Sequence, residues 1–219
     1  MEGKINYQKE LDKIISKIST DKKPSLLLHA CCGPCSSYVI EYLSNFFDIT
    51  IYYYNPNIYP PAEYERRFNE LKDFLPRFPQ AVENKVKLVE ADYNPQEFYK
   101  AVDVENNPEL KTEPEKGERC RRCYLLRLEK SFEYAKANHF DYFTTTLSIS
   151  PYKDAEKINT IGYTFVSTDT NYLPADFKKK GGFLRSTQLS KEYNLYRQDY
   201  CGCVFSMNNS SHGIEQSGN

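Results

Sequence analysis

Seven cysteines, gathered in three short clusters, are the residues of this chain best suited to chemistry. The first cluster is Cys-Cys-Gly-Pro-Cys at residues 31–35, the second is Cys-Arg-Arg-Cys at 120–123, and the third is Cys-Gly-Cys at 201–203. A sulfur-rich set suits zinc or iron–sulfur centres rather than magnesium or calcium. Because a structural zinc ion or one iron–sulfur cluster takes about four protein ligands, the remaining sulfurs are left for a second metal or for a reaction.

The first cluster also contains Cys32-Gly-Pro-Cys35, the redox-active sequence of thioredoxins. A dithiol shuttle between Cys32 and Cys35 is therefore one alternative interpretation. It leaves the clusters at 120–123 and 201–203 without a role, and the chain lacks the tryptophan that generally precedes the thioredoxin motif. A zinc-stabilised RNA-binding module without catalysis is the second alternative.

The clusters need a scaffold, and the apolar pattern of the chain predicts alternating strands and helices. Strands are predicted at residues 25–30, 48–54, 86–91 and 141–148, and helices at 11–18, 36–47, 61–75, 96–102 and 122–139. This alternation is typical of an α/β fold with a mostly parallel sheet flanked by helices. Residues 162–174 fit a strand or an extended loop equally well, and the C-terminal third is less regular.

Ligands of parallel α/β sheets bind beyond the carboxyl ends of the strands, which is where the cluster at 31–35 falls. The helix that follows directs its free N–H groups and its positive dipole end at the same loop, which favours thiolates. A nucleophile and a metal ligand both require the thiolate, so this position does not separate the two uses. The second cluster lies at the start of the long predicted helix, where Arg119, Arg121 and Arg122 are expected to offset the thiolate charge.

Composition narrows the classes of protein that remain. The chain has 219 residues and a formal net charge of −1, so no overall basic excess indicates nucleic-acid binding, and any such site must be local. We expect one catalytic α/β domain over residues 1–207, with an N-terminal helical segment at 1–22 and a disordered tail at 208–219. The sequence shows no pattern of a signal peptide or a membrane span, so we expect a cytoplasmic protein without membrane partners. Disulfides are rare in the cytoplasm.

Five stretches of the sequence are LLLHACCGPCSSYVIEYL, YYYNPNIYPPAEYERR, GERCRRCYLLRLEKS, DYFTTTLSISPYKD and LPADFKKKGGFLRSTQLSKEYNLYRQDYCGCVFS. Together they run from about residue 26 to residue 206 and resemble the epoxyqueuosine reductase family of the QueH type. The resemblance implies a Rossmann-like fold and an oxidoreductase that converts epoxyqueuosine to queuosine in the anticodon loop of tRNA, without cobalamin. It also implies a [4Fe-4S] cluster, an additional iron ion and an electron donor that the sequence does not identify.

The resemblance implies that six cysteines bind metal: Cys31, Cys32, Cys120, Cys123, Cys201 and Cys203. It does not divide them between the two centres. Our hypothesis is a cluster on Cys31, Cys120, Cys123 and Cys201, with Cys32, Cys35 and Cys203 on the additional iron. His29, at the end of the first predicted strand, is a further candidate, either as a ligand or as a group that orients one. A buried histidine with ordinary hydrogen bonds explains the same position.

Removal of an epoxide oxygen as water consumes two electrons and two protons. In the expected chemistry the cluster supplies the electrons and the additional iron acts as a Lewis acid. Tyr200, next to Cys201, is the first candidate for the proton donor, with Arg197 and Asp199 as alternatives. Simple packing explains Tyr200 equally well.

A basic stretch within residues 176–206, the segment expected to bind tRNA and metal, is the candidate for phosphate binding. Its positive side chains are those of Lys178, Lys179, Lys180 and Arg185. The flanking Phe177 and Phe183 would stack on unpaired bases, and the double glycine would give flexibility. Charge alone favours an ordinary solvated loop here, and only the resemblance favours tRNA. The tyrosine-rich stretch at 52–59 is a second candidate wall for the base.

Overall fold

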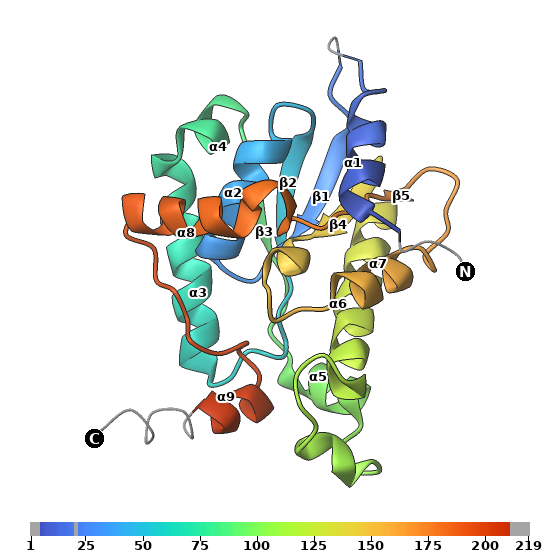
Figure 1. Ribbon diagram of the computed structural model, residues 1–219, viewed down its shortest axis with the longest axis vertical. Coiled ribbons are helices and arrows are strands. Elements are labelled where there is room, and N and C mark those ends of the chain that lie inside the picture. The colour runs from blue at the N-terminus through green and yellow to red at the C-terminus, as the bar shows by residue number, and fades with distance from the viewer. Residues whose placement is uncertain (1–4, 20–21, 211–219) are drawn as a thin grey trace.

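The computed structural model describes residues 5–19 and 22–210, the last three by their backbone only. A five-stranded sheet lies at its centre, with helices on both faces (Figure 1). The strands follow the spatial order β3-β2-β1-β4-β5, and all four pairings are parallel. Their bounds are β1 Ser25–His29, β2 Asp48–Tyr53, β3 Lys87–Glu90, β4 Tyr142–Thr145 and β5 Asn171–Tyr172. The predicted parallel α/β fold is therefore confirmed, and the undecided stretch 162–174 contains the two-residue edge strand β5.

The helices divide between the two faces of the sheet. They are α1 Tyr7–Ile15, α2 Gly33–Leu43, α3 Pro61–Phe74, α4 Pro79–Glu83, α5 Pro95–Val102, α6 Glu118–Ala137, α7 Ala155–Gly162, α8 Gly182–Glu192 and α9 Val204–Ser210. Because side chains alternate along a strand, Leu26 and Leu28 of β1 pack with α2 and α3, while Leu27 packs with α6. In the described ranges, no helix combines the length and the apolar character needed to cross a bilayer.

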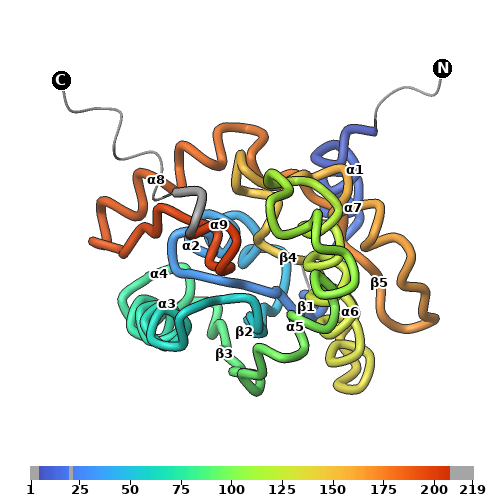
Figure 2. Tube along the Cα trace, turned by 90° about the horizontal axis from the view of Figure 1, so that it is seen from below, coloured from blue at the N-terminus to red at the C-terminus, as the bar shows by residue number. Residues whose placement is uncertain are grey.

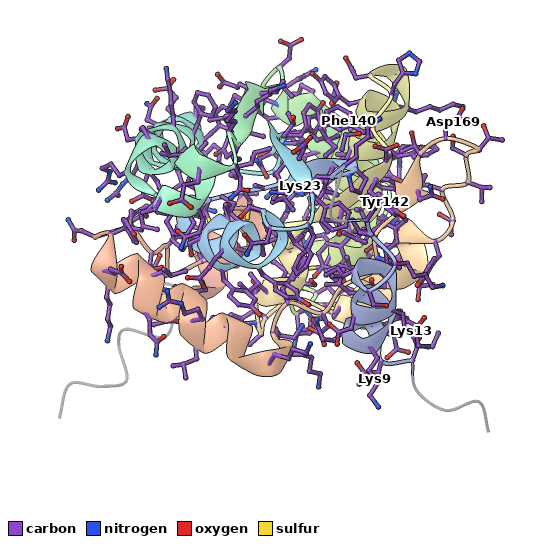
Figure 3. All side chains as sticks on the ribbon, turned by 90° about the horizontal axis from the view of Figure 1, so that it is seen from above. Lys9, Lys13, Lys23, Phe140, Tyr142 and Asp169 are labelled. Carbon is purple, nitrogen blue, oxygen red and sulfur yellow. The ribbon has the colours of Figure 1, made fainter. Side chains whose placement is uncertain are left out.

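Helix α1 covers the face of the sheet on which Leu26 and Leu28 pack against α2 and α3. It begins at Tyr7, four residues before the predicted start, because the side chain of Asn6 accepts a hydrogen bond from the backbone N–H of Lys9. Leu11 is fully buried, while Lys9 and Lys13 point away from the sheet, as the view from above shows (Figure 3). The amphipathic character expected of this segment is thus present.

Helix α2 begins inside the first cysteine cluster. Cys32 is its N-cap residue, and the Sγ atom of Cys32 accepts a hydrogen bond from the backbone N–H of Cys35 at 3.3 Å. The predicted start at residue 36 was three residues too late, because Pro34 occupies the first turn, where a missing N–H costs the helix nothing. The first cluster is therefore part of the strand-to-helix turn.

Helix α6 begins at Glu118, four residues before the predicted start. The carboxylate of Glu113 accepts hydrogen bonds from the backbone N–H groups of Glu118 and Arg119, at 2.7 Å each, and so caps the helix. Cys120 and Cys123 consequently lie within its first two turns.

Strand β4 ends at Thr145, three residues before the predicted strand end. The hydroxyl of Thr145 accepts a hydrogen bond from the backbone N–H of Leu147 and starts the 3₁₀ helix Thr146–Ile149. The chain therefore turns away from the sheet immediately after β4.

Helix α8 is a regular element within a segment that the sequence describes as irregular. A Cβ atom on Gly182 would lie 2.0 Å from the carbonyl oxygen of Phe177 and 2.5 Å from the ring of Tyr38, so this glycine permits close packing rather than flexibility. The hydroxyl of Ser186 donates to the carbonyl of Pro34 at 2.8 Å and joins α8 to α2. Of the tail predicted at residues 208–219, the first three residues belong to α9 and the others lie outside the described residues.

Candidate metal centre

A cavity of about 400 Å³ lies at the carboxyl ends of β1 and β4. Its walls include Cys31 and Cys35 after β1, Lys153 after β4, and the stretch 197–201. Strand β1 lies between β2 and β4, so the connections that follow β1 and β4 leave in different directions, a point at which α/β sheets bind ligands. Helices α5 and α9 lie at the same end of the molecule (Figure 1), which Figure 2 views from below.

The cysteines of the first cluster form what we call the loop sulfur group: Cys31, Cys32 and Cys35. Their Sγ atoms all lie within 4.8 Å of one another, and those of Cys31 and Cys32 are 4.0 Å apart. Sulfurs bound 2.3 Å from one tetrahedral ion are about 3.8 Å apart, so this group fits a single metal ion.

One sulfur of the loop sulfur group is set apart as a thiolate. Hydrogen bonds from Cys32 and Cys35, helped by the charges of Arg127 and Arg67, hold the pKa of Cys31 well below its ordinary value. Burial raises the pKa of Cys32 to about 12. Within this group the thiolate form is therefore favoured most at Cys31, and a thiol binds a metal ion once it loses its proton.

The remaining cysteines form the helix sulfur group: Cys120 and Cys123 of α6, with Cys201 and Cys203 of the C-terminal segment. All four line a small space of about 10 Å³. Within the described part of the chain, no three of these sulfurs approach as closely as those of the loop sulfur group. Four thiolates on the separate irons of a cluster stand further apart than ligands of one ion, so this group fits a cluster better than a single ion.

The thiolate of the helix sulfur group is Cys201. A hydrogen bond from Cys203 and the positive charges of Lys153 and Arg127 hold the pKa of Cys201 well below its ordinary value. The ammonium group of Lys153 donates directly to the Sγ atom of Cys201. Burial raises the pKa of Cys123 to about 11. Each sulfur group thus holds one favoured thiolate.

Arg119 provides an independent test of whether an anionic group fits beside the helix sulfur group. Its side chain is almost fully buried and lines the same small space. The Nε and Nη2 atoms of Arg119 find no hydrogen-bond partner among the described residues. Buried donors without partners are rare in proteins, and the sulfides of an iron–sulfur cluster accept such bonds. The residues present therefore fit a bound iron–sulfur cluster.

The arginines expected to offset the thiolate charge are arranged differently from the prediction. Arg121 and Arg122 both pair with the carboxylate of Glu118, through Nε atoms at 2.6 and 3.0 Å, so only Arg119 of the three lies at the sulfurs. Two further cations, Arg127 and Lys153, line the space of the helix sulfur group, and neither was predicted from the sequence. Arg127 follows Cys123 by four residues on one helix, a spacing that places both on the same face.

Arg127 is held by two uncharged partners. Its Nη2 atom donates to the Oδ1 atom of Asn55 at 2.6 Å, and its Nε atom donates to the Nε2 atom of His29 at 3.2 Å. The Nδ1 atom of His29 lies 2.7 Å from the hydroxyl of Thr145, and its Nε2 atom also lies 3.1 Å from the carbonyl oxygen of Tyr54. Burial, together with the charge of Arg127, lowers the pKa of His29 to about 3. His29 therefore helps to orient the side chain of Arg127.

The predicted proton donors all line the large cavity: Tyr200, Arg197 and Asp199. The hydroxyl of Tyr200 donates to the carbonyl of Tyr59 at 2.6 Å, and burial, with the nearby charge of Glu63, raises the pKa of Tyr200 to about 12. The Nη1 atom of Arg197 donates to the hydroxyl of Ser190 at 3.1 Å.

Three of the four predicted tRNA-binding cations make ion pairs within the chain. Lys178 pairs with Asp176 at 2.9 Å, Lys180 with Asp12 at 2.8 Å, and Arg185 with Glu41 at 2.5 Å. Lys179 is exposed.

The aromatic residues near the basic stretch also differ from expectation. Phe177 is fully buried and cannot stack on a base, so that part of the prediction was wrong. Phe183 and Tyr152 line the large cavity with 37% and 68% of their surfaces exposed. None of residues 52–59 is among the lining residues of that cavity, and their contact with the base stays a prediction.

Comparison with known proteins gives a consistent result. A sequence model of the family described as Epoxyqueuosine reductase QueH matches residues 26–209. The chain is 44% identical over 206 residues to the Epoxyqueuosine reductase QueH of Streptococcus pyogenes serotype M1, covering 92% of this chain and 78% of that protein. It is 43% identical over 204 residues to the protein of that name from Staphylococcus epidermidis (92% and 84%), and 37% identical over 201 residues to that from Haemophilus influenzae (90% and 78%).

Proposed function

The chain belongs to the epoxyqueuosine reductase QueH family, and we propose that it reduces epoxyqueuosine to queuosine in the anticodon loop of tRNA in the cytoplasm. The observation that carries the proposal is the placement of two sulfur groups beside one cavity, whose size suits a small organic ligand such as a modified nucleoside. The reaction takes two electrons and two protons, forms the carbon–carbon double bond of queuosine and releases the epoxide oxygen as water.

A [4Fe-4S] cluster and an additional iron ion, without cobalamin, are the cofactors that we propose. The cluster would supply electrons one at a time, and the iron would act as a Lewis acid. The sequence assigned Cys31 to the cluster and Cys203 to the additional iron. The distances within the loop sulfur group support a different division, in which that group holds the iron and the helix sulfur group holds the cluster. Only Cys31 and Cys203 change their assignment between the two divisions.

Several residues of the chain would serve the substrate rather than the cofactors. Tyr200, Arg197 and Asp199 remain the candidates for moving a proton to the leaving oxygen, because they line the cavity that contains Cys31 and Cys201. Leu147 and Ile149 line the same cavity and would exclude water from the reacting atoms.

The tRNA would be held outside the cavity. The exposed rings of Tyr152 and Phe183 support stacking on bases beside the modified one. Lys178, Lys179, Lys180 and Arg185 remain candidates for the phosphates, and three of them would exchange a carboxylate partner for a phosphate on binding.

The thiol-shuttle alternative is less well supported. A shuttle that uses Cys32 and Cys35 needs one of them as a low-pKa nucleophile, whereas burial raises the pKa of Cys32, and hydrogen bonds to Cys31 raise that of Cys35. A zinc-stabilised module leaves the large cavity and its polar lining without a role.

The deciding experiment is conversion of tRNA that contains epoxyqueuosine. The protein is reconstituted with iron and sulfide without oxygen, reduced chemically and incubated with that tRNA, and the nucleosides are then analysed by mass spectrometry. Queuosine is expected only from the iron-loaded, reduced protein. Failure to form queuosine with a fully loaded cluster would refute the proposed function, and full activity with zinc alone would refute the cofactors.

A further inference from the structure

Three residues line both the large cavity and the small space of the helix sulfur group: Arg127, Lys153 and Cys201. The side chains of Arg127 and Lys153 therefore lie between the large cavity and the sulfurs of α6. We call these two side chains the cationic wall. Neither was needed to explain the fold, and neither carries a role in the proposed function above.

The cations of this wall contact sulfur and uncharged groups directly, and the carboxylate of Glu115 lies near Lys153 without forming an ion pair. Arg127 is 2% exposed and Lys153 is 8% exposed, and within the described residues neither forms an ion pair with an acidic side chain. Arg127 instead contacts the neutral His29 and an amide, while Lys153 contacts the sulfur of Cys201. Arg67 gives the contrast, because it is fully buried near Cys31 and Cys32 but pairs with Glu63 at 2.6 Å.

Buried unpaired charges are costly unless something of the opposite sign lies beside them. The ammonium group of Lys153 donates to the Sγ atom of Cys201, and the carboxylate of Glu115 lines the large cavity with it. Arg127 lies near Cys123 and Cys201 of the helix sulfur group and near Cys31 of the loop sulfur group. Arg127 therefore lies beside sulfurs of both groups, and Lys153 beside a sulfur of the helix sulfur group.

We propose that the cationic wall of Arg127 and Lys153 raises the reduction potential of the centre held by the helix sulfur group. The inference rests on the proposed function for the presence of that centre. Each electron that enters from a one-electron reductant adds one negative charge and changes no covalent bond, and a nearby buried positive charge stabilises that reduced state more than the oxidised one. Arg127 and Lys153 act here as positioning residues for charge, not as catalytic residues.

The two cations differ in reach, which makes the proposal more specific. The positive charge of Arg127 favours the thiolate form of Cys31 in the loop sulfur group and of Cys123 and Cys201 in the helix sulfur group. The ammonium group of Lys153 contacts the sulfur of Cys201, and its charge favours the thiolate form of Cys120 and Cys123. Loss of Lys153 should therefore affect the helix sulfur group, whereas loss of Arg127 should affect both groups.

The test is a redox titration of the reconstituted full chain, followed by electron paramagnetic resonance of the reduced cluster. At the midpoint of the unmodified protein, Lys153→Met should lower the ratio of reduced to oxidised cluster about tenfold, which for one electron is a shift of about 59 mV to more negative potential. Lys153→Arg keeps the charge and should stay within about twofold. Arg122→Met is the matched control, because it removes a charge of α6 that pairs with Glu118, and Glu118 keeps Arg121 as a partner.

An unchanged midpoint in a fully loaded Lys153→Met protein would overturn the inference, as would equal shifts in Lys153→Met and Arg122→Met. If Lys153→Met and Lys153→Gln both fail to retain iron while Lys153→Arg retains it, the requirement for positive charge is supported by iron content itself. Loss of iron from Lys153→Arg as well would overturn it. The midpoint is measured without tRNA, so a protein that shows the shift but forms no queuosine would refute the proposed function and leave this inference standing.

Discussion

The loop sulfur group takes its cysteines from five consecutive residues, whereas the helix sulfur group joins the first turns of α6 to a segment far along the chain. The first is built by one local event, the passage from β1 into α2, with Cys32 as the N-cap residue. The second exists only when residues 195–203 lie along α3 and reach α6. Local construction keeps the three sulfurs of the loop sulfur group within 4.8 Å of one another, while the helix sulfur group depends on long-range contacts.

Those long-range contacts are specific. The carboxylate of Glu70 on α3 accepts a hydrogen bond from the backbone N–H of Tyr196, and the guanidinium of Arg66 lies 3.4 Å from the centre of the Tyr196 ring. Further along, the backbone N–H of Tyr59 donates to the carbonyl of Gly202 at 2.7 Å. A change at these contacts should reach the helix sulfur group and leave the loop sulfur group intact.

The sharpest test of the comparison replaces Cys31 and Cys203 one at a time, because the two divisions of the cysteines assign these residues to different centres. We expect Cys203→Ala to lose most of its iron and acid-labile sulfide, about four irons per chain, and Cys31→Ala to lose about one iron and keep its sulfide. The physical reason is that Cys203 is a ligand of the cluster and Cys31 a ligand of the single iron if each sulfur group holds one centre. Iron and sulfide analysis after anaerobic reconstitution measures this, and the reverse pattern would restore the division predicted from the sequence.

Weakening the attachment of the C-terminal segment should have the next largest effect. Glu70→Ala removes the acceptor for Tyr196 and should lower the free energy of unfolding by about 1–2 kcal/mol. A chelator should then remove iron faster from the helix sulfur group than from the loop sulfur group. Denaturant unfolding and the rate of iron loss measure the two effects, with Glu65→Ala, an exposed position on α3, as the control. Equal acceleration at both groups would argue against separate construction.

Tyr200 tests whether the C-terminal segment also contributes chemistry. If its hydroxyl moves a proton, Tyr200→Phe should lower turnover about 10²-fold while iron content stays the same. If the hydroxyl only fastens Gly202 and its neighbours through the carbonyl of Tyr59, turnover of the loaded protein should be unchanged and iron should leave the helix sulfur group faster. Tyr196→Phe is the control, because that hydroxyl contacts Glu63 instead.

The smallest expected effect comes from an ion pair remote from both groups. Burial alone would raise the pKa of Asp12. Hydrogen bonds from Lys180, Tyr42 and Gln8 outweigh burial and hold the pKa of Asp12 below its ordinary value. The carboxylate therefore stabilises the fold at neutral pH, and this contribution is lost as the pH falls below about 4. Asp12→Asn should cost about 0.5 kcal/mol at pH 7, and this cost should shrink as the pH falls below about 4.

Unfolding of the Asp12→Asn protein across that pH range measures the difference, and both sulfur groups should keep their iron. Loss of iron from either group would show that the contact between α1 and Lys180 supports the metal centre, contrary to the comparison.

The sequence predicted more of the loop sulfur group than of the helix sulfur group, for a physical reason. A strand, a cysteine turn and a helix are local patterns, so the order of β1, its loop and α2 could be predicted. The three clusters identified all seven cysteines, because residue type alone limits the candidates. The contribution of Lys153 could not be predicted, since it depends on how the chain turns after β4, and that turn is fixed by Thr145 and tertiary packing.

Arg119, Arg121 and Arg122 show the same limit from the other side. Their charges are evident in the sequence, but the side chains of Arg121 and Arg122 reach Glu118 rather than the sulfurs. Charge can be counted from a sequence, whereas the partner of each charge depends on the side-chain direction within a helical turn.

Helix α6 presents Cys120, Cys123 and Arg127 along one face, at steps of three and four residues. A helix turns about 100° per residue, so one residue inserted between Cys123 and Arg127 would rotate the guanidinium to a different side of the helix. Substitutions along the outer face of α6 leave that alignment unchanged, while an insertion or deletion in these eight positions would break it even if every side chain were kept. The length of this short segment is therefore expected to be under stronger constraint than most of its residue identities.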